Sequence, residues 1–326
     1  MAATHSNNSI LRESIRLVGS GAAGQVVALL LLAVIGRQYD QETMGVLGSF
    51  LSWGGLLAIA SGARYEQGIV VASAEDEAQT LYHLALRISL IFALVLLPIV
   101  LAIGYVNPSL TPLGSSIYAL PFFVLLSTWY NASALWELRH KRYKILAKMQ
   151  FIKGVGNNLL KAVFGFVAAT IGSLISAQIL SLIATFPLFF RSLKKGSKAP
   201  KTTSLRSVAK KHRGFPRYGI VQALIDNLLG SLLVLMLPLR YGLAEVGYLT
   251  MAIMLARRPL QLVAENLSNV YFQRLSECVS QRQSIRQLTY KLLRNTLIVS
   301  IPTALLLSQV APYLVSLVVG DKWLPS

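Results

Sequence analysis

The sequence predicts an all-α protein that crosses a membrane several times, and three observations support this. The mean hydropathy is +0.56 with 13% charged residues, whereas about 25% charged is usual in soluble domains. Apolar runs near the roughly 20 residues needed to cross a bilayer recur along the whole chain. Backbone polar groups find no water in hydrocarbon, so helices are the economical form for such runs. We therefore expect a polytopic helical membrane protein.

The apolar runs predict about nine transmembrane helices. Their expected ranges are 14–36, 44–69, 84–105, 117–136, 151–170, 172–190, 218–239, 246–271 and 295–319. A lysine-rich stretch with Gly, Ser, Pro and Thr, typical of a linker, separates the sixth from the seventh. We predict a six-helix N-terminal lobe over 1–193, a basic cytoplasmic linker over 194–217, and the start of a second lobe over 218–326, incomplete with three spans and expected to be truncated.

The net charge of +18 is unevenly distributed. With the N-terminus in the cytoplasm, twenty-five of the 31 Lys and Arg residues fall in cytoplasmic loops and three in outer loops. An excess of Lys and Arg is typical of cytoplasmic loops, so we predict this orientation. Charge arranged in this way reflects orientation rather than a nucleic-acid surface, and nucleic acid is not an expected partner.

Enzyme, metal and cofactor sites are not expected. A single cysteine, Cys278, excludes an internal disulfide and a cysteine cluster, and the four histidines lack metal-ligand spacing. Gly19-x-Gly21-x-x-Gly24 follows no strand, so we interpret these glycines as small residues that let helices approach closely. A membrane-embedded glycosyltransferase or polymerase would need a large soluble loop with an acidic metal-binding motif. The longest predicted loop is basic and about 27 residues long.

Two ionisable residues of opposite charge are predicted at similar membrane depth. A charge there costs at least about 2.5–3.5 kcal/mol unless it meets water or a partner. Lys161 follows Phe151 by ten residues, or about 15 Å of helix. Asp226 lies at a similar depth in the second lobe, where it could serve as a proton or cation site for coupling. Alternatively, Lys161 extends toward an interface or forms a static pair with Asp226.

Further charged residues lie in or beside the predicted spans. Arg257 and Arg258 are about eleven residues into the eighth span, beside Pro259. They are candidates for anion binding, because guanidinium groups bind phosphate oxygens bidentately. Alternatively, they extend toward the cytoplasm if the span is shifted or broken at Pro259. Arg64 and Glu66 are secondary candidates that we expect to mark the inner boundary of the second span.

The sequence also contains a short internal repeat across the predicted linker. R-Q-Y-D-Q-E-T-M-G-V-L begins at Arg37, and R-Y-G-L-A-E-V-G-Y-L begins at Arg240. Both stretches follow an apolar run and share Arg, Tyr, Glu and Gly in order. Repeats of this kind in transporters place the substrate at the interface between the two halves.

Seven short motifs occur in a fixed order along the chain. They are Arg64 to Val70, Trp136 to Tyr143, Phe215-Pro216-Arg217-Tyr218, Gly242 to Gly247, Pro259, Phe272 to Glu277 and Gly320 to Trp323. In these motifs the chain resembles the polysaccharide (O-antigen) exporter and flippase family, within the multidrug/oligosaccharidyl-lipid/polysaccharide exporter superfamily. Family members generally carry twelve or more spans in two lobes, so the resemblance implies a fragment or an incomplete second lobe.

The resemblance implies a flippase of the bacterial inner membrane that moves a polyprenyl-pyrophosphate-linked oligosaccharide, an O-antigen or capsule repeat unit, by alternating access. It implies a cationic cavity in which Lys161 and Arg257 or Arg258 hold the headgroup. Expected partners are the lipid-linked glycan, the bilayer, polysaccharide polymerase and glycosyltransferases. A drug/cation antiporter of the same superfamily, and a non-transporting fragment or scaffold of polysaccharide assembly, are the alternatives.

Overall fold

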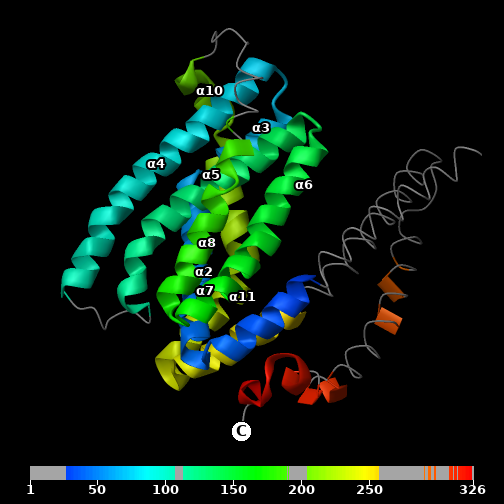
Figure 1. Cartoon of the computed structure of the whole chain (residues 1–326). Helices are drawn as coiled ribbons and strands as arrows, with labels where there is room; N and C mark the ends of the chain where they lie inside the picture. The colour runs from blue at the N-terminus through cyan, green and yellow to red at the C-terminus, as the bar shows by residue number, and fades with distance from the viewer. Residues whose placement is uncertain are drawn as a thin grey trace, which may run out of the picture. The chain divides into compact units, whose positions relative to one another are not determined.

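The regular elements in the described part of the chain are all helical. The computed structural model describes residues 27–106, 113–188, 190, 204–256, 290, 293–294, 297–298, 308–310, 312–313 and 315–324. No β-strand occurs among them (Figure 1), which confirms the all-α prediction. The chain divides into two compact units, Gln38–Thr250 in one and Met1–Arg37 with Met251–Ser326 in the other. The first unit contains the helices discussed below.

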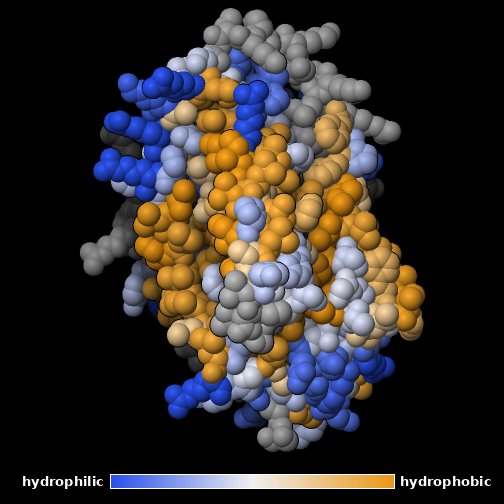
Figure 2. Space-filling model, turned by 90° about the vertical axis from the view of Figure 1, so that its left-hand side faces the viewer, coloured by the Kyte–Doolittle hydropathy of each residue, from blue (hydrophilic) through white to orange (hydrophobic). Residues whose placement is uncertain are grey.

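Four helices in the described ranges are long and apolar enough to cross a membrane. They are Gln41–Ser61 (α2), Glu75–Tyr105 within α4 (Glu75–Val106), Ile171–Leu188 beginning with α8 (Ile171–Ile183), and Phe215–Tyr241, formed by a π-helical turn η4 (Phe215–Gly219) and α11 (Ile220–Tyr241). Figure 2 shows hydrophobic side chains over the middle of one face and hydrophilic ones toward its ends. Apolar surface of this extent is unfavourable in water. The chain is a polytopic membrane protein, and the other expected crossings stay predictions.

Helix α4 is longer than a bilayer crossing requires. Its 32 residues extend for about 48 Å, against a hydrocarbon core of about 30 Å. The first turn contains Glu75, Asp76 and Glu77, whose negative charge is favourable at a helix N-terminus. The acidic start of α4 therefore belongs to a polar end of the helix, ahead of its apolar part.

The predicted crossing 44–69 is wrong in its second part, because helix α2 ends at Ser61. Ala63 and Arg64 have φ of 48° and 58°, in the left-handed region that ends an α-helix. A short helix, α3 (Tyr65–Val71), then begins. It packs against α4 and against α5 (Leu120–Arg139), which follows the 3-10 turn η2 (Gly114–Ala119). The shared core includes Tyr65, Ile69, Tyr82 and Trp136.

The next three segments form one helical rod. They are α6 (Tyr143–Phe151) with 9 residues, a π-helical turn η3 (Ile152–Gly156) with 5, and α7 (Asn157–Val167) with 11. At 1.5 Å per residue the rod is about 38 Å long. Helix α7 packs against α8, and α5 contacts both α6 and α8 (Figure 1). The rod therefore replaces the predicted crossing 151–170 and begins eight residues earlier.

The two copies of the internal repeat meet where α2 crosses the helix Leu243–Ala256. A Cβ atom on Gly45 would lie 1.9 Å from the carbonyl oxygen of Leu243, and one on Gly247 would lie 1.9 Å from that of Gln41. Gly45 corresponds to Gly247 in the repeat, and Gln41 to Leu243. The contacts are thus reciprocal, as a local two-fold relation between the two motifs requires.

Candidate functional site

Three polar residues form a row along one face of the rod. Lys153, Asn157 and Lys161 are spaced four residues apart, and residues at this spacing lie on the same side of a helix. Lys161 is 3% exposed and Asn157 9% exposed, while Lys153 is half-buried. From Lys153 to Lys161 the rod rises by about 12 Å. We refer to these three residues as the polar row.

Lys153 contacts helix α5 through an aromatic ring. Its Nζ lies 4.0 Å from the ring centroid of Tyr130, a cation–π contact that accommodates an ammonium group among apolar neighbours. Lys153 lies in the π-helical turn, and such turns are frequent at functional sites. Lys153 was not among the predicted site residues. The spacing of Lys153, Asn157 and Lys161 was the signal that could have found it.

Asn157 contacts helix α8. Its Nδ2 donates a hydrogen bond of 2.7 Å to Oε1 of Gln178, and both side chains are buried. The Oδ1 atom of Asn157 is also buried but has no hydrogen-bond partner. A buried polar atom without a partner costs about 1–3 kcal/mol. The row therefore contains one acceptor that the described part of the chain does not satisfy.

Lys161, the first residue predicted for the site, is indeed buried. Its backbone carbonyl accepts a hydrogen bond of 2.9 Å from the hydroxyl of Tyr39, which also lies 2.9 Å from Oγ of Ser173 on α8. The α7 backbone at Lys161 is thereby fixed against two other segments. Its role as a substrate ligand stays a prediction.

The other predicted site residues lie elsewhere. Asp226 has an exposed side chain on α11 and is not part of the polar row. Arg257 and Arg258 lie outside the described residues. Arg64 and Glu66 lie at the corner between α2 and α3, with Nη1 of Arg64 4.0 Å from Oε1 of Glu66. The structure thus brings Arg64 near Glu66. It places Lys161 in a row with Lys153 and Asn157, two residues that the sequence-based prediction did not include.

Glu66 is a buried carboxyl group with incomplete hydrogen bonding. It is 4% exposed, and its Oε2 has no hydrogen-bond partner. Helix α3 lies outside the four helices that could cross a membrane. Burial raises the pKa of Glu66 above its ordinary value, opposed by a backbone hydrogen bond and by the charge of Arg64. The guanidinium of Arg64, 4.0 Å away, therefore compensates only in part for the lost hydration of the carboxylate.

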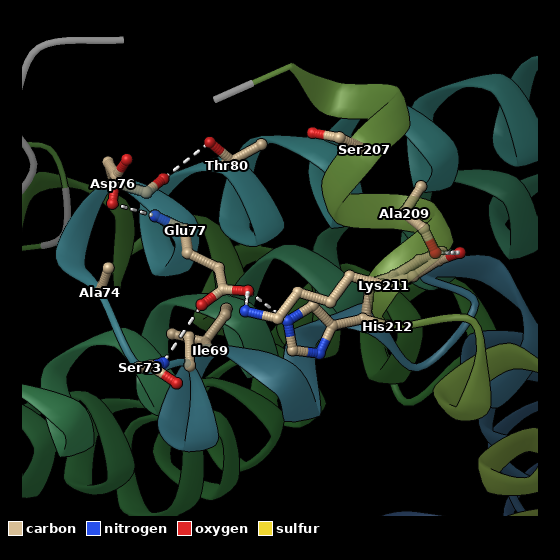
Figure 3. A network of polar contacts seen from close by, with 12 residues as sticks. Ile69, Ser73, Ala74, Asp76, Glu77, Thr80, Ser207, Ala209, Lys211 and His212 are labelled. Carbon is tan, nitrogen blue, oxygen red and sulfur yellow. Dashed lines mark hydrogen bonds and ion pairs between the residues drawn. The ribbon is translucent and has the colours of Figure 1, made fainter. Parts of the chain in front are cut away.

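Glu77 is buried too, but its carboxylate is well satisfied. It accepts hydrogen bonds from Nζ of Lys211 at 2.5 Å and from the backbone N–H of Ser73 at 3.2 Å, and Nε2 of His212 lies 2.8 Å away (Figure 3). Lys211 ends helix α10 (Leu205–Lys211), and His212 follows it. These contacts join α10 to the start of α4.

Arg139 holds the end of α3 at the same corner. Its Nη1 donates to the carbonyl oxygens of Ile69 at 2.9 Å and Ala72 at 2.8 Å, and its Nε donates to Oε2 of Glu75 at 3.2 Å. The last carbonyls of a helix lack partners within the helix, so a cation there is stabilising. We refer to Glu66, Glu75, Glu77, Arg139, Lys211 and His212 as the ionic corner.

The fold and the polar row define a class of protein: a polytopic helical membrane protein with basic groups buried among its helices. Within the described ranges, no group of three or more His, Cys, Asp or Glu residues is placed to hold a metal ion. A family model for polysaccharide biosynthesis proteins matches residues 68–326. The chain belongs to this family, in agreement with the resemblance found in its sequence. No curated protein and no solved structure matches the chain.

Proposed function

We propose that the chain is a flippase that moves a polyprenyl-pyrophosphate-linked oligosaccharide, an O-antigen or capsule repeat unit, across the bacterial inner membrane. Its family places the chain in polysaccharide biosynthesis, and its apolar helices place it in a membrane. A saccharide built on a lipid carrier in the cytoplasm has to cross the bilayer before it reaches the cell surface. The N-terminus is cytoplasmic in this proposal. Glycosyltransferases act before transport, and a polymerase acts after it.

The observation that carries the proposal is the burial of Lys161. The side chain is 3% exposed on α7, between apolar helices. An ammonium group in this position is costly, and such residues in membrane proteins generally mark substrate or ion pathways. The sequence contains no Asp or Glu between Glu137 and Asp226. A diphosphate group is a dense anion, and it suits a basic surface with few acidic neighbours.

The proposed mechanism is alternating access without covalent chemistry. The headgroup enters from the cytoplasm, the lipid tail stays in the bilayer, and the two halves rock to expose the saccharide outside. The reciprocal contact of Gly45 and Gly247 supports this, because equivalent segments of both halves meet there. Arg257 or Arg258, which lie outside the described residues, are further proposed ligands of the headgroup, and Asp226 is proposed to couple transport to an ion gradient or the membrane potential.

The experiment is surface-glycan measurement in a strain whose glycan export depends on this chain. Lys161→Gln, and separately Arg257→Ala with Arg258→Ala, should reduce surface glycan at least about tenfold, because losing a charged contact to phosphate costs about 1.5–3 kcal/mol. Lys148→Gln removes an exposed lysine from the same rod and is the control. Undiminished glycan for Lys161→Gln, at normal protein level in the membrane, would remove the observation that carries the proposal.

A further inference from the structure

We infer that the polar row is a composite site for a sugar diphosphate, in which Lys153 and Lys161 bind the two phosphate groups and Asn157 binds the first sugar. This inference rests on the proposed function and names the residues that would recognise the headgroup. It adds Lys153 and Asn157 to the single lysine that the sequence indicated.

The spacing of the two lysines fits one diphosphate. Their Cα atoms are separated by about 12 Å along the rod, and an extended lysine side chain reaches about 6 Å. Both residues lie on the same face, so the two ammonium groups can contact one ligand that lies along the rod. A lipid monophosphate offers a single phosphate group and would engage one lysine at a time.

The contact between Lys153 and Tyr130 provides a resting position for the first ammonium group. The ring of Tyr130 attracts the cation but gives it no hydrogen-bond acceptor of full charge. Phosphate oxygens form shorter and stronger charge-assisted hydrogen bonds. Lys153 therefore exchanges the ring for a phosphate group when the ligand arrives.

Asn157 contributes the acceptor in the middle of the row. Its Nδ2 is bonded to Gln178, and this hydrogen bond fixes the orientation of the amide. Its Oδ1 is buried and without a partner. A phosphate oxygen cannot donate to Oδ1, but a sugar hydroxyl can. The unsatisfied atom thus points to the sugar joined to the diphosphate.

Lys144 and Lys148 on α6 provide matched controls. Both are exposed, and the described part of the chain offers them no ion pair. They are typical of lysines at a membrane surface, where they raise the affinity for anionic lipid in general. A composite site predicts that Lys153 behaves like Lys161 rather than like these neighbours on the same rod.

The test is binding of farnesyl diphosphate and farnesyl monophosphate to the purified full chain in lipid nanodiscs, measured by isothermal titration calorimetry. Lys153→Gln and Lys161→Gln should each weaken diphosphate binding about tenfold and reduce the preference for diphosphate over monophosphate. Lys144→Gln and Lys148→Gln should stay within about twofold of the unchanged chain. Lys153→Arg keeps the charge and should retain the preference, which separates loss of charge from loss of fold.

A second probe, a farnesyl diphosphate carrying one N-acetylglucosamine, tests Asn157. Asn157→Leu should weaken its binding several-fold while leaving farnesyl diphosphate unchanged, because only the glycosylated probe supplies a hydroxyl donor. If Lys161→Gln weakens binding but Lys153→Gln behaves like Lys148→Gln, the composite site is overturned and the proposed function survives. If neither Lys153→Gln nor Lys161→Gln weakens binding, both the composite site and the role of Lys161 in the proposed function are overturned.

Discussion

The ionic corner and the polar row both place polar side chains among packed helices, but their contacts differ. In the corner, Glu77 and Arg139 have charged partners within hydrogen-bond distance. In the row, Lys153 lies on an aromatic ring and Asn157 keeps an unsatisfied acceptor. The fold pairs the charges of Glu77 and Arg139, whereas Oδ1 of Asn157 is left for a ligand to satisfy in the proposed site. Substitutions in the corner should therefore damage stability, and those in the row should damage function.

The largest expected effect on stability comes from Glu77→Gln. The substitution leaves the Lys211 ammonium and His212 without their carboxylate and presents an amide N–H to them. We expect a loss of about 2–3 kcal/mol, below the roughly 3–5 kcal/mol for a fully buried ion pair, because Lys211 is exposed and can turn to water. Thermal unfolding in detergent measures this. The exposed Glu245→Gln should leave the melting temperature unchanged, and an equal melting temperature for both variants would contradict the assignment.

Arg139→Lys should have a smaller and more local effect. A lysine cannot donate in a fixed fork to Ile69, Ala72 and Glu75 together. We expect a loss of about 1–2 kcal/mol, from one or two weakened hydrogen bonds. Hydrogen exchange should rise at the end of α3, with Arg87→Lys on the exposed side of α4 as the control. Unchanged exchange at Ala72 and Ser73 would show that Arg139 does not hold this end.

Lys153→Met should separate stability from function most sharply. The unbranched apolar side chain keeps the contact with Tyr130 and removes a half-buried charge, so stability should change by less than about 1 kcal/mol in either direction. Surface glycan should nevertheless fall about tenfold at equal protein level. A melting temperature lowered as much as by Glu77→Gln, with normal glycan, would place Lys153 among the structural charges.

Glu66→Gln gives the smallest effect, and its sign depends on pH. Because burial raises the pKa of Glu66, the protonated form is favoured in the folded chain, and its contribution to stability is lost as pH rises above the ordinary value of 4.5. Glutamine resembles the protonated form. The variant should thus match the unchanged chain near pH 4 and be slightly more stable at pH 7, in melting curves across this range. A variant less stable at pH 7 would instead show that Arg64 stabilises the carboxylate.

Sequence patterns predicted the long apolar helices best. The expected crossing 218–239 lies within Phe215–Tyr241, whereas the membrane depth of Lys161 stays a prediction. Hydrophobicity over 20 residues depends little on tertiary contacts, so it can be deduced locally. The membership in a polysaccharide biosynthesis family was also visible in short motifs.

Features that depend on packing could not be deduced in this way. Gly62 directly follows α2 and is a local signal for a helix end, but the expected crossing was extended past it to Ile69, and the left-handed residues Ala63 and Arg64 are not glycines. The π-helical turn at Lys153 could not be predicted either, because Gly154 and Gly156 weaken the local helix preference but do not specify a π-helical turn. The hydrogen bond of Asn157 to Gln178 joins separate helices. Each feature arises from tertiary contacts that outweigh local preference.

The crossing of α2 with Leu243–Ala256 has a mechanical consequence. Most helix pairs interlock through side chains, which must disengage before the helices can turn against each other. At Gly45 and Gly247 backbone faces backbone, so no side chains have to separate there before the helices move. The two helices can therefore rotate against each other at this crossing. A single methyl group on either glycine would clash with the facing backbone and hinder that rotation.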